Sequence, residues 1–233
     1  MCLQNLRRFL GDIDLKFYRD RYLPLKIVEM DLPKNIQALD LLYKTYWAER
    51  EFISFDTFYE RYKSQYSSVL EEFRVKTQMC EICFYKGLPA RIYRTWASII
   101  TQIHAGYVAQ SVFGPETVEM SSDLDHRGAD FRVNYHGNKL NFQVKKMSRS
   151  REIREAKGSK KKLDGQDILI EYKVPDAKIM REPRTKKGGF KKAYSDFKTQ
   201  WIDTGKLEVL DNGFVIFTPV IFSEKKAELD ASE

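Results

Sequence analysis

The sequence predicts an α/β protein in which a mixed β-sheet core flanked by helices follows an N-terminal helical region. Three observations predict this fold class. Residues 34–78 and 90–113 carry apolar side chains at spacings of three and four, as amphipathic helices do. Residues 131–135 and 140–144 alternate apolar and polar side chains, which is typical of half-buried strands. Stretches rich in β-branched and aromatic side chains indicate two further strands, at residues 167–174 and 213–220.

The order of these elements divides the chain into a helical region packed on the core, the core itself with basic loops, and a polar, frayed tail: residues 1–86, 87–224 and 225–233. Gly87-Leu88-Pro89 predicts a break before the second long helix, because proline has no amide hydrogen for a helix interior. We expect the helix from Ala90 to Phe113 to pack under the strands that follow it.

Length and composition narrow the class of protein. The chain has 233 residues, of which 42% are hydrophobic and 13% aromatic, so it can bury a sizeable core and is not disordered. No run approaches the ~18 apolar residues of a membrane span, and Met1 to Phe9 lacks the apolar segment of a signal peptide. We therefore expect a cytoplasmic protein with no membrane partner.

Three cysteines do not make a disulfide framework. Cys80-Glu81-Ile82-Cys83 is a single CxxC motif without a second pair. A structural zinc site usually needs four ligands, and the only residues that could complete one are Cys2, His104, His126 and His136. The pair is therefore interpreted as two ordinary cysteines in a reducing cytosol, with a zinc half-site as the alternative.

The positive charge of the protein lies in one segment. The formal net charge is +7, and residues 145–198 alone hold 18 Lys and Arg against 8 Asp and Glu. A basic surface favours a polyanion, because Lys and Arg release counterions when they contact phosphates. A lysine run such as residues 160–162 is by itself more typical of a solvated loop. For the whole segment we predict binding to double-stranded DNA, with eight candidate residues: Lys146, Arg149, Arg151, Arg184, Lys186, Lys187, Lys191 and Lys192.

The two alternating runs around His136-Gly137 predict a β-hairpin. Opposed residues share a face, so apolar residues meet apolar residues only when the paired residue numbers sum to an odd value. A His136-Gly137 turn places Asp130 opposite Gln143, with Lys145 on the diagonal, whereas a Gly137-Asn138 turn places Asp130 opposite Lys145. Both registers bring a carboxylate, an amide and an ammonium group within roughly 5 to 8 Å on one polar face.

This polar face resembles the catalytic core of the PD-(D/E)xK nucleases, in which an Asp and a Glu-x-Lys on adjacent strands hold a divalent metal. The second element is Gln143-Val144-Lys145 here, and Gln offers a carbonyl oxygen without a charge. A Mg²⁺ site would therefore need help, and Asp125 is the nearest candidate. The alternative is a surface hairpin whose polar face is merely solvated.

Six stretches together resemble the TaqI family of type II restriction endonucleases over nearly the whole chain. They are YLPLKIVEMDLP at residues 22–33, ARIYRTWASIITQIHAGYV at 90–108, LDHRGAD at 124–130, FQVKK at 142–146, EPRT at 182–185 and NGFVIFTP at 212–219. The resemblance implies a restriction-endonuclease-like fold and a Mg²⁺-dependent homodimer. Such an enzyme cuts TCGA in double-stranded DNA and leaves 5′-phosphate ends. A partner adenine-N6 DNA methyltransferase protects the same site in the host.

The resemblance also assigns roles to residues. It places the acidic pair on Asp125 and Asp130 and the Q-x-K element on Gln143 and Lys145, with Asp130, Gln143 and Asp125 as metal ligands. The implied reaction is in-line attack by water on the scissile phosphorus, with Lys145 positioning the water or neutralising developing charge. Two other classes stay open: a repair or recombination nuclease with the same core, and a noncatalytic DNA-binding protein.

Overall fold

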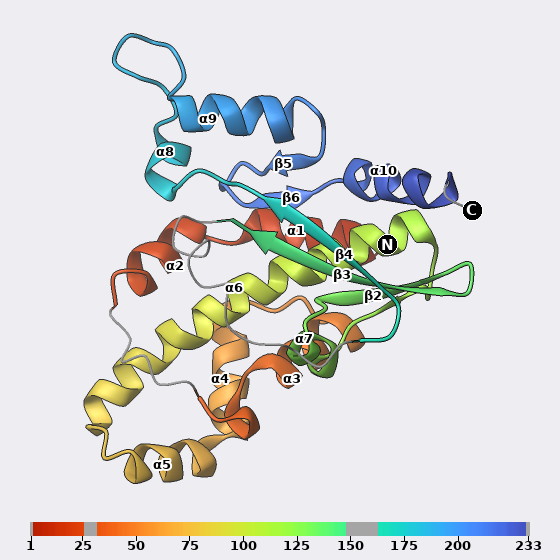
Figure 1. The fold of residues 1–233 in the computed structure, drawn as a ribbon. Coiled ribbons are helices and arrows are strands. Elements are labelled where there is room, and N and C mark those ends of the chain that lie inside the picture. The colour runs from red at the N-terminus through yellow and green to blue at the C-terminus, as the bar shows by residue number, and fades with distance from the viewer. Residues whose placement is uncertain (1, 26–31, 148–162, 232–233) are drawn as a thin grey trace. The chain divides into compact units, whose positions relative to one another are not determined.

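A computed structural model describes residues 2–25, 32–147 and 163–231 (Figure 1). The chain forms two compact units, Cys2–Ile103 and His104–Glu233, and it passes from the first to the second within helix α6. The first unit is helical, and the second contains a mixed four-stranded sheet, a small second sheet and further helices. The predicted α/β class, with helices before the sheet, is confirmed. Within the described ranges, no helix is long and apolar enough to cross a membrane.

Helices account for the regular structure described in the first unit. They are α1 (Cys2–Asp12), α2 (Leu15–Tyr22), a 3₁₀ turn (Lys34–Ile36), α3 (Leu39–Leu42), a π-helical turn (Tyr43–Ala48), α4 (Phe55–Gln65), α5 (Ser67–Lys76) and the start of α6 (Glu81–Phe113). The predicted helical stretch at residues 34–78 is therefore helical but divided. One division has a local cause, because the hydroxyl of Ser54 accepts a hydrogen bond from the amide of Thr57 and caps a new helix.

The aromatic side chains at helical spacing form the core of this unit, as the sequence predicted. The indole N–H of Trp96 donates to the hydroxyl of Tyr46 at 2.8 Å, and that hydroxyl donates to the carbonyl of Ile53 at 2.7 Å. The hydroxyl of Tyr62 donates to the carbonyl of Ile36 at 2.6 Å. Burial raises the pKa of Tyr46 and of Tyr62, so both stay neutral donors. The polar ends of these rings are thus satisfied inside the core.

The predicted break at Gly87-Leu88-Pro89 is wrong, because α6 runs without interruption from Glu81 to Phe113. Pro89 removes one helical hydrogen bond. The turn on either side is nevertheless held by packing, since Phe84 and Leu88 are buried on the same stripe as Ile92. Side chains spaced by four residues therefore continue the apolar face across the proline.

The main sheet of the second unit has the strand order β1-β2-β3-β4. Its strands are β1 (Val118–Glu119), β2 (Phe131–Tyr135), β3 (Asn138–Lys146) and β4 (Gln166–Tyr172). Strands β2 and β3 are antiparallel, whereas β3 and β4 are parallel. Tyr135 pairs with Asn138 across a two-residue turn in which His136 and Gly137 have φ values of 47° and 77°. Two positive φ values are typical of a type I′ turn. Of the two registers left open by the sequence, the structure has the one with the His136-Gly137 turn.

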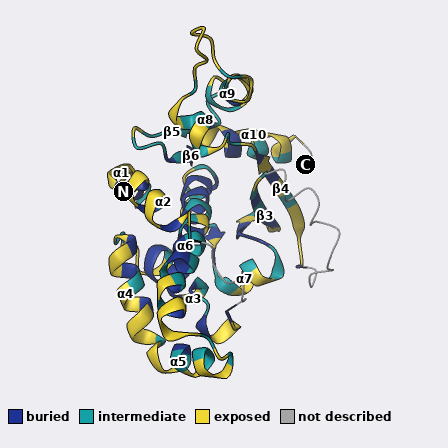
Figure 2. Ribbon diagram, turned by 90° about the vertical axis from the view of Figure 1, so that its left-hand side faces the viewer, coloured by how far each residue is buried: buried dark blue, intermediate teal, exposed yellow. Residues whose placement is uncertain are grey.

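Aromatic rings cover the apolar side of this sheet. Phe131 and Phe142 stack with ring centroids 5.0 Å apart, and Phe222 of α10 (Pro219–Asp230) lies edge-on to both. Phe113, at the end of α6, contacts Phe142 and Tyr135, so this end of the helix packs against the hairpin as expected. Figure 2 shows that the middle of β3 is buried, whereas its ends and several residues of β4 are exposed.

The rest of the second unit comprises helices α7 (Ser122–Arg127), α8 (Ala177–Arg181) and α9 (Lys192–Phe197), a π-helical turn (Lys198–Ile202) and the antiparallel pair β5 (Leu207–Val209) and β6 (Val215–Phe217). The strand predicted at residues 213–220 is shorter because Pro219 begins α10. The expected frayed tail from residue 225 is helical through Asp230. The hydroxyl of Tyr135 donates to the carboxylate of Asp230 at 2.7 Å, which ties this end of the chain to the hairpin.

Candidate active site

A capped helical turn delivers the acidic pair to the sheet. The hydroxyl of Ser121 accepts a hydrogen bond from the amide of Leu124 at 3.2 Å and so starts α7. Gly128 ends the helix in a left-handed conformation, and its N–H donates to the carbonyls of Leu124 and Asp125. The chain therefore leaves α7 and reaches Asp130, directly before β2, within two residues. Asp125 lies half-buried on the helix that contacts β2.

Asp130 connects the two strands of the hairpin. Its amide donates to the carbonyl of Phe142 at 2.8 Å, and its carboxylate accepts a hydrogen bond from the amide of Val144 at 2.6 Å. Only 6% of the residue is exposed. Because Val144 lies between Gln143 and Lys145, this bond holds the Asp130 carboxylate next to both of the other predicted residues. A hydrogen bond from a backbone amide to a carboxylate is charge-assisted and fixes the position of that carboxylate.

The structure therefore brings Asp130, Gln143 and Lys145 together. Gln143 and Lys145 are half-buried on β3, two positions apart, and so point to the same face. The polar face of the hairpin is partly buried: Asn141, on the same side of β3, is only 2% exposed. This observation argues against a simple solvated hairpin.

The oxygen donors of Asp125, Asp130 and Gln143 are of the kind that a small, hard divalent cation prefers. Two carboxylates, Asp125 and Asp130, and the amide oxygen of Gln143 are the predicted ligands. Mg²⁺ commonly binds through one or two carboxylates, substrate phosphate and waters rather than in an all-protein cage. The donor set fits this pattern. Within the described ranges, no group of three or more His, Cys, Asp and Glu is placed to hold a metal.

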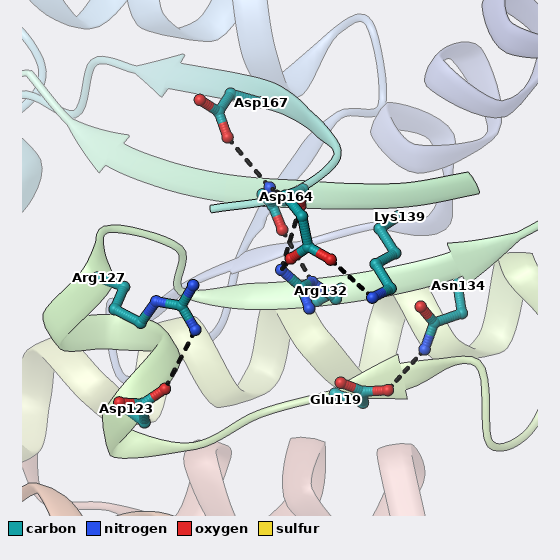
Figure 3. Close-up of polar contacts among 9 residues, drawn as sticks. Glu119, Asp123, Arg127, Arg132, Asn134, Lys139, Asp164 and Asp167 are labelled. Carbon is teal, nitrogen blue, oxygen red and sulfur yellow. Dashed lines mark hydrogen bonds and ion pairs between the residues drawn. The ribbon is translucent and has the colours of Figure 1, made fainter. Parts of the chain in front are cut away.

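Sequence reasoning missed a polar cluster on the same face, formed by Arg132, Lys139, Asn141, Asp164 and Asp167, which we call the Arg132 cluster (Figure 3). Arg132 donates to the side-chain oxygen of Asn141 at 2.9 Å and to the carboxylate of Asp164 at 2.8 Å. The Asn141 amide donates to the Asp164 carbonyl at 3.0 Å and to Asp167 at 3.2 Å, and Lys139 donates to Asp164 at 2.7 Å. These bonds tie the hairpin to the start of β4.

The turn before β4 has little room for side chains. Gly165 has a φ of +103°, and a Cβ built there would lie 2.1 Å from the carbonyl oxygen of Lys139. Asp164 precedes it, and the hydrogen bond from Lys139, followed by the charge of Arg132, lowers the pKa of Asp164. Asp164-Gly165 was a turn signal in the sequence. Its partners depend on the parallel pairing of β3 with β4, which the sequence did not give.

Glu171 is a second residue that sequence reasoning missed. It pairs in register with Lys145 across the parallel strands β3 and β4, and it is exposed. Paired residues in adjacent strands point to the same face of a sheet. A further carboxylate therefore lies on the face that carries Lys145. The alternation in DILIEYKV puts Asp167 and Glu171 on one face, but the sequence did not show which strand lies beside them.

The predicted DNA-binding residues are distributed over three places. Lys146 is exposed at the end of β3. Arg149 and Arg151 lie outside the described residues. The remaining five lie on the loop between α8 and α9 and at the start of α9: Arg184, Lys186, Lys187, Lys191 and Lys192.

The loop between α8 and α9 closes on itself (Figure 1). Arg184 and Phe190 form an antiparallel bridge, and the amide of Lys191 donates to the carbonyl of Pro183 at 2.8 Å. The guanidinium of Arg184 lies 4.8 Å from the centre of the Phe190 ring and donates to the carbonyl of Gly188 at 2.9 Å. Arg184 thus stabilises the loop, and the exposed Lys186 and Lys187 stand between its two arms.

A mixed sheet with an Asp directly before one strand and Gln-x-Lys on the next is consistent with a nuclease of the restriction-endonuclease class. Comparison with known proteins identifies the family. The family model described as TaqI restriction endonuclease matches residues 3–225, and the chain belongs to this family. Its enzymatic class is therefore the type II restriction endonucleases, which are site-specific deoxyribonucleases that bind double-stranded DNA and generally use a divalent metal.

Two relatives show how far the similarity extends. The type II restriction enzyme TaqI of Thermus aquaticus is 31% identical over 223 residues, which cover 93% of this chain and 83% of that protein. The type II restriction enzyme TthHB8I of Thermus thermophilus is 30% identical over 222 residues, covering 92% and 83%. No solved structure matches the chain significantly.

Proposed function

We propose that this protein cleaves double-stranded DNA at TCGA in a Mg²⁺-dependent reaction and leaves 5′-phosphate ends. The observation that carries the cleavage proposal is the hydrogen bond from the amide of Val144 to Asp130, which holds an acidic group beside Gln143 and Lys145. The choice of TCGA rests on membership of the TaqI family. A cytoplasmic location and a host adenine-N6 DNA methyltransferase acting on the same site belong to the same proposal.

In the proposed mechanism, Asp130, Asp125 and Gln143 would hold Mg²⁺, which would stabilise the negative charge that develops on the phosphoryl group. Asp130 is kept in place by its backbone contacts, so little reorganisation is needed when the substrate binds. Lys145 orients the attacking water or neutralises charge at the scissile phosphate. Glu171, its neighbour on β4, helps to hold the Lys145 ammonium group over the sheet.

The proposed active form is a homodimer. A palindromic site suits a twofold dimer, because each subunit can then meet one strand in the same way. The eight candidate DNA-binding residues would contact the phosphates, and bidentate donors among them would read guanine edges. Because the Arg184 guanidinium is engaged within its own loop, Lys186 and Lys187 are the better candidates for contacts at the loop tip.

Plasmid digestion tests the proposed function. Wild type and Asp130→Ala are incubated with plasmid DNA and Mg²⁺, and the fragment ends are sequenced. Discrete cuts at TCGA with 5′-phosphates, absent in the variant, are expected. Discrete cuts at another string would overturn the specificity alone. A smear would indicate a structure-directed or nonspecific nuclease, and intact DNA with retained DNA binding would indicate a noncatalytic DNA-binding protein.

A further inference from the structure

Two exposed cysteines lie at the start of α6 and have no part in the proposed cleavage. Cys80 directly precedes the helix, and its carbonyl accepts a hydrogen bond from the amide of Phe84 at 2.8 Å. Cys80 is therefore the residue that caps the N-terminus, and Cys83 is the third residue of the first turn. Both thiols can be reached from solvent while they remain on one rigid turn.

Cys80 and Cys83 lie three residues apart on one helical turn, at the cap position and at the third helical residue. At an ordinary cap the side chain of the first of these positions reaches the backbone N–H of the second, so the two side chains start from neighbouring points. Residues three apart on a helix have Cα atoms about 5 Å apart. This separation lies within the range of about 4.4–6.8 Å that a disulfide requires.

The surroundings make the two cysteines different. The backbone N–H of Cys83 and then its thiol lower the pKa of Cys80, with a smaller contribution from the charge of Arg74. The thiol of Cys80 in turn raises the pKa of Cys83. The charged groups nearby are Arg74, which forms an ion pair with Glu71, and Glu81 at the start of the helix. The helix N-terminus still favours a thiolate at Cys80, which is the nucleophilic form of cysteine.

We propose that Cys80 and Cys83 form a dithiol that small-molecule disulfides oxidise to an intramolecular disulfide, a modification site separate from the nuclease function. The Cys80 thiolate first attacks one sulfur of the small disulfide, forming a mixed disulfide and releasing one thiolate. Cys83 then loses its proton to solvent, and its sulfur attacks the Cys80 sulfur and releases the second thiolate. Two protein thiols are oxidised, and one small disulfide is reduced to two thiols.

Among the residues that the structure describes, no group of three or more His, Cys, Asp and Glu is placed to hold a metal at this pair. A structural zinc normally takes four protein ligands, of which the pair supplies two. Disulfide formation, in contrast, needs only the two sulfur atoms that the first turn of α6 already brings together.

The test uses the full chain with Cys2→Ser, so that the pair is the only source of thiols. This protein and its Cys80→Ser and Cys83→Ser derivatives are incubated with glutathione disulfide and followed by intact mass and thiol titration. The pair is expected to lose both thiols without keeping glutathione. Cys83→Ser is expected to keep one glutathione on Cys80. Cys80→Ser should add glutathione at least about tenfold more slowly than Cys83→Ser does.

A separate measurement checks that the variants are folded. Serine is a favoured residue at a helix N-terminus, so Cys80→Ser should keep the far-ultraviolet circular dichroism of the parent. The proposal is overturned if the two single variants react equally fast. It is also overturned if the pair accumulates glutathione adducts and forms no intramolecular disulfide.

Discussion

The polar face of the β2–β3 hairpin has two regions that differ in how deeply their basic side chain is buried. In the Arg132 cluster, a cation that is 8% exposed donates to Asn141 and Asp164, and the bonds extend to Lys139 and Asp167. Next to it, Lys145 is half-buried, beside Gln143 and the carboxylate of Asp130. One cation is enclosed by a fixed set of partners, and the other remains accessible.

The difference suggests that one region of this face stabilises the fold and the other takes part in cleavage. Arg132 offers several donors in a fixed plane, which suits the joining of a hairpin to a neighbouring turn. Lys145 offers a compact charge on a flexible stem, which suits a group that must meet a phosphate. The Arg132 cluster fixes how β3 lies against β4, and this register decides which residue accompanies Lys145. We therefore expect substitutions in the two regions to affect different measurements.

The largest effect is expected from Lys145→Met, which removes the accessible cation and keeps a similar side-chain length. Cleavage should fall on the order of 10²–10³-fold, because a group that stabilises developing charge is lost. The free energy of unfolding should change by less than about 1 kcal/mol. Single-turnover cleavage and denaturant titration measure the two quantities. A loss of stability as large as that of Arg132→Met would remove the distinction between the regions.

Gly165→Ala should cause the largest loss of stability, about 2–4 kcal/mol, from a left-handed backbone and a clash with the carbonyl of Lys139. Gly137→Ala is the matched control, because its φ is +77° but nothing lies within 4 Å of the added methyl group. The control should lose about 1 kcal/mol. Denaturant unfolding of both variants measures the difference, and equal losses would mean that the close approach at Gly165 has no energetic importance.

Arg132→Met is the counterpart of Lys145→Met on the same face. It leaves the oxygen atoms of Asn141 and Asp164 without a donor from this side chain, so the free energy of unfolding should fall by about 2 kcal/mol. Cleavage at low temperature, where the variant is folded, should fall much less than in Lys145→Met. If cleavage were lost equally while the protein remained folded, Arg132 would belong to the chemical site.

Glu171→Gln should reduce cleavage two- to fivefold, since opposite charges on paired residues at an exposed position interact by about 1 kcal/mol or less. The expected mechanism is a less well-held Lys145, so the effect should vanish in a Lys145→Met background. Glu119→Gln is the control, because this carboxylate lies on β1 and accepts a hydrogen bond from Asn134. A reduction that persists in the Lys145→Met background would show that Glu171 acts independently of Lys145.

The smallest effect concerns acid stability. Lys139 and Arg132 lower the pKa of Asp164 below its ordinary value, so folding favours the ionised carboxylate. This contribution is present above the unfolded pKa and is lost as pH falls through the lower folded pKa. Asp164→Asn should therefore lose less stability than wild type between about pH 4 and pH 2. The free energy of unfolding of both proteins is measured by denaturant titration across this pH range. If it fell equally in both, Asp164 would not contribute to acid sensitivity.

The sequence by itself determined the local features of this protein. The hairpin was predictable because alternation and side-chain parity allow only two short registers, and the structure has one of them. Asp130, Gln143 and Lys145 could be placed together for the same reason. Charge counting located the basic segment, and family motifs identified the class of enzyme. The helices were likewise predictable from apolar spacing, because that spacing reflects a period of 3.6 residues within one segment.

Only the tertiary structure decided the features that depend on distant partners. The uninterrupted α6 depends on packing around Pro89 that outweighs a local helix-breaking preference. Glu171 lies beside Lys145 because β3 and β4 run parallel, and periodicity within each strand carries no information about that pairing. Arg132 was predicted on a polar face and is buried, because Asp164, 32 positions away in sequence, supplies its partner. Local patterns fix which face a side chain occupies, whereas long-range contacts decide what that face meets.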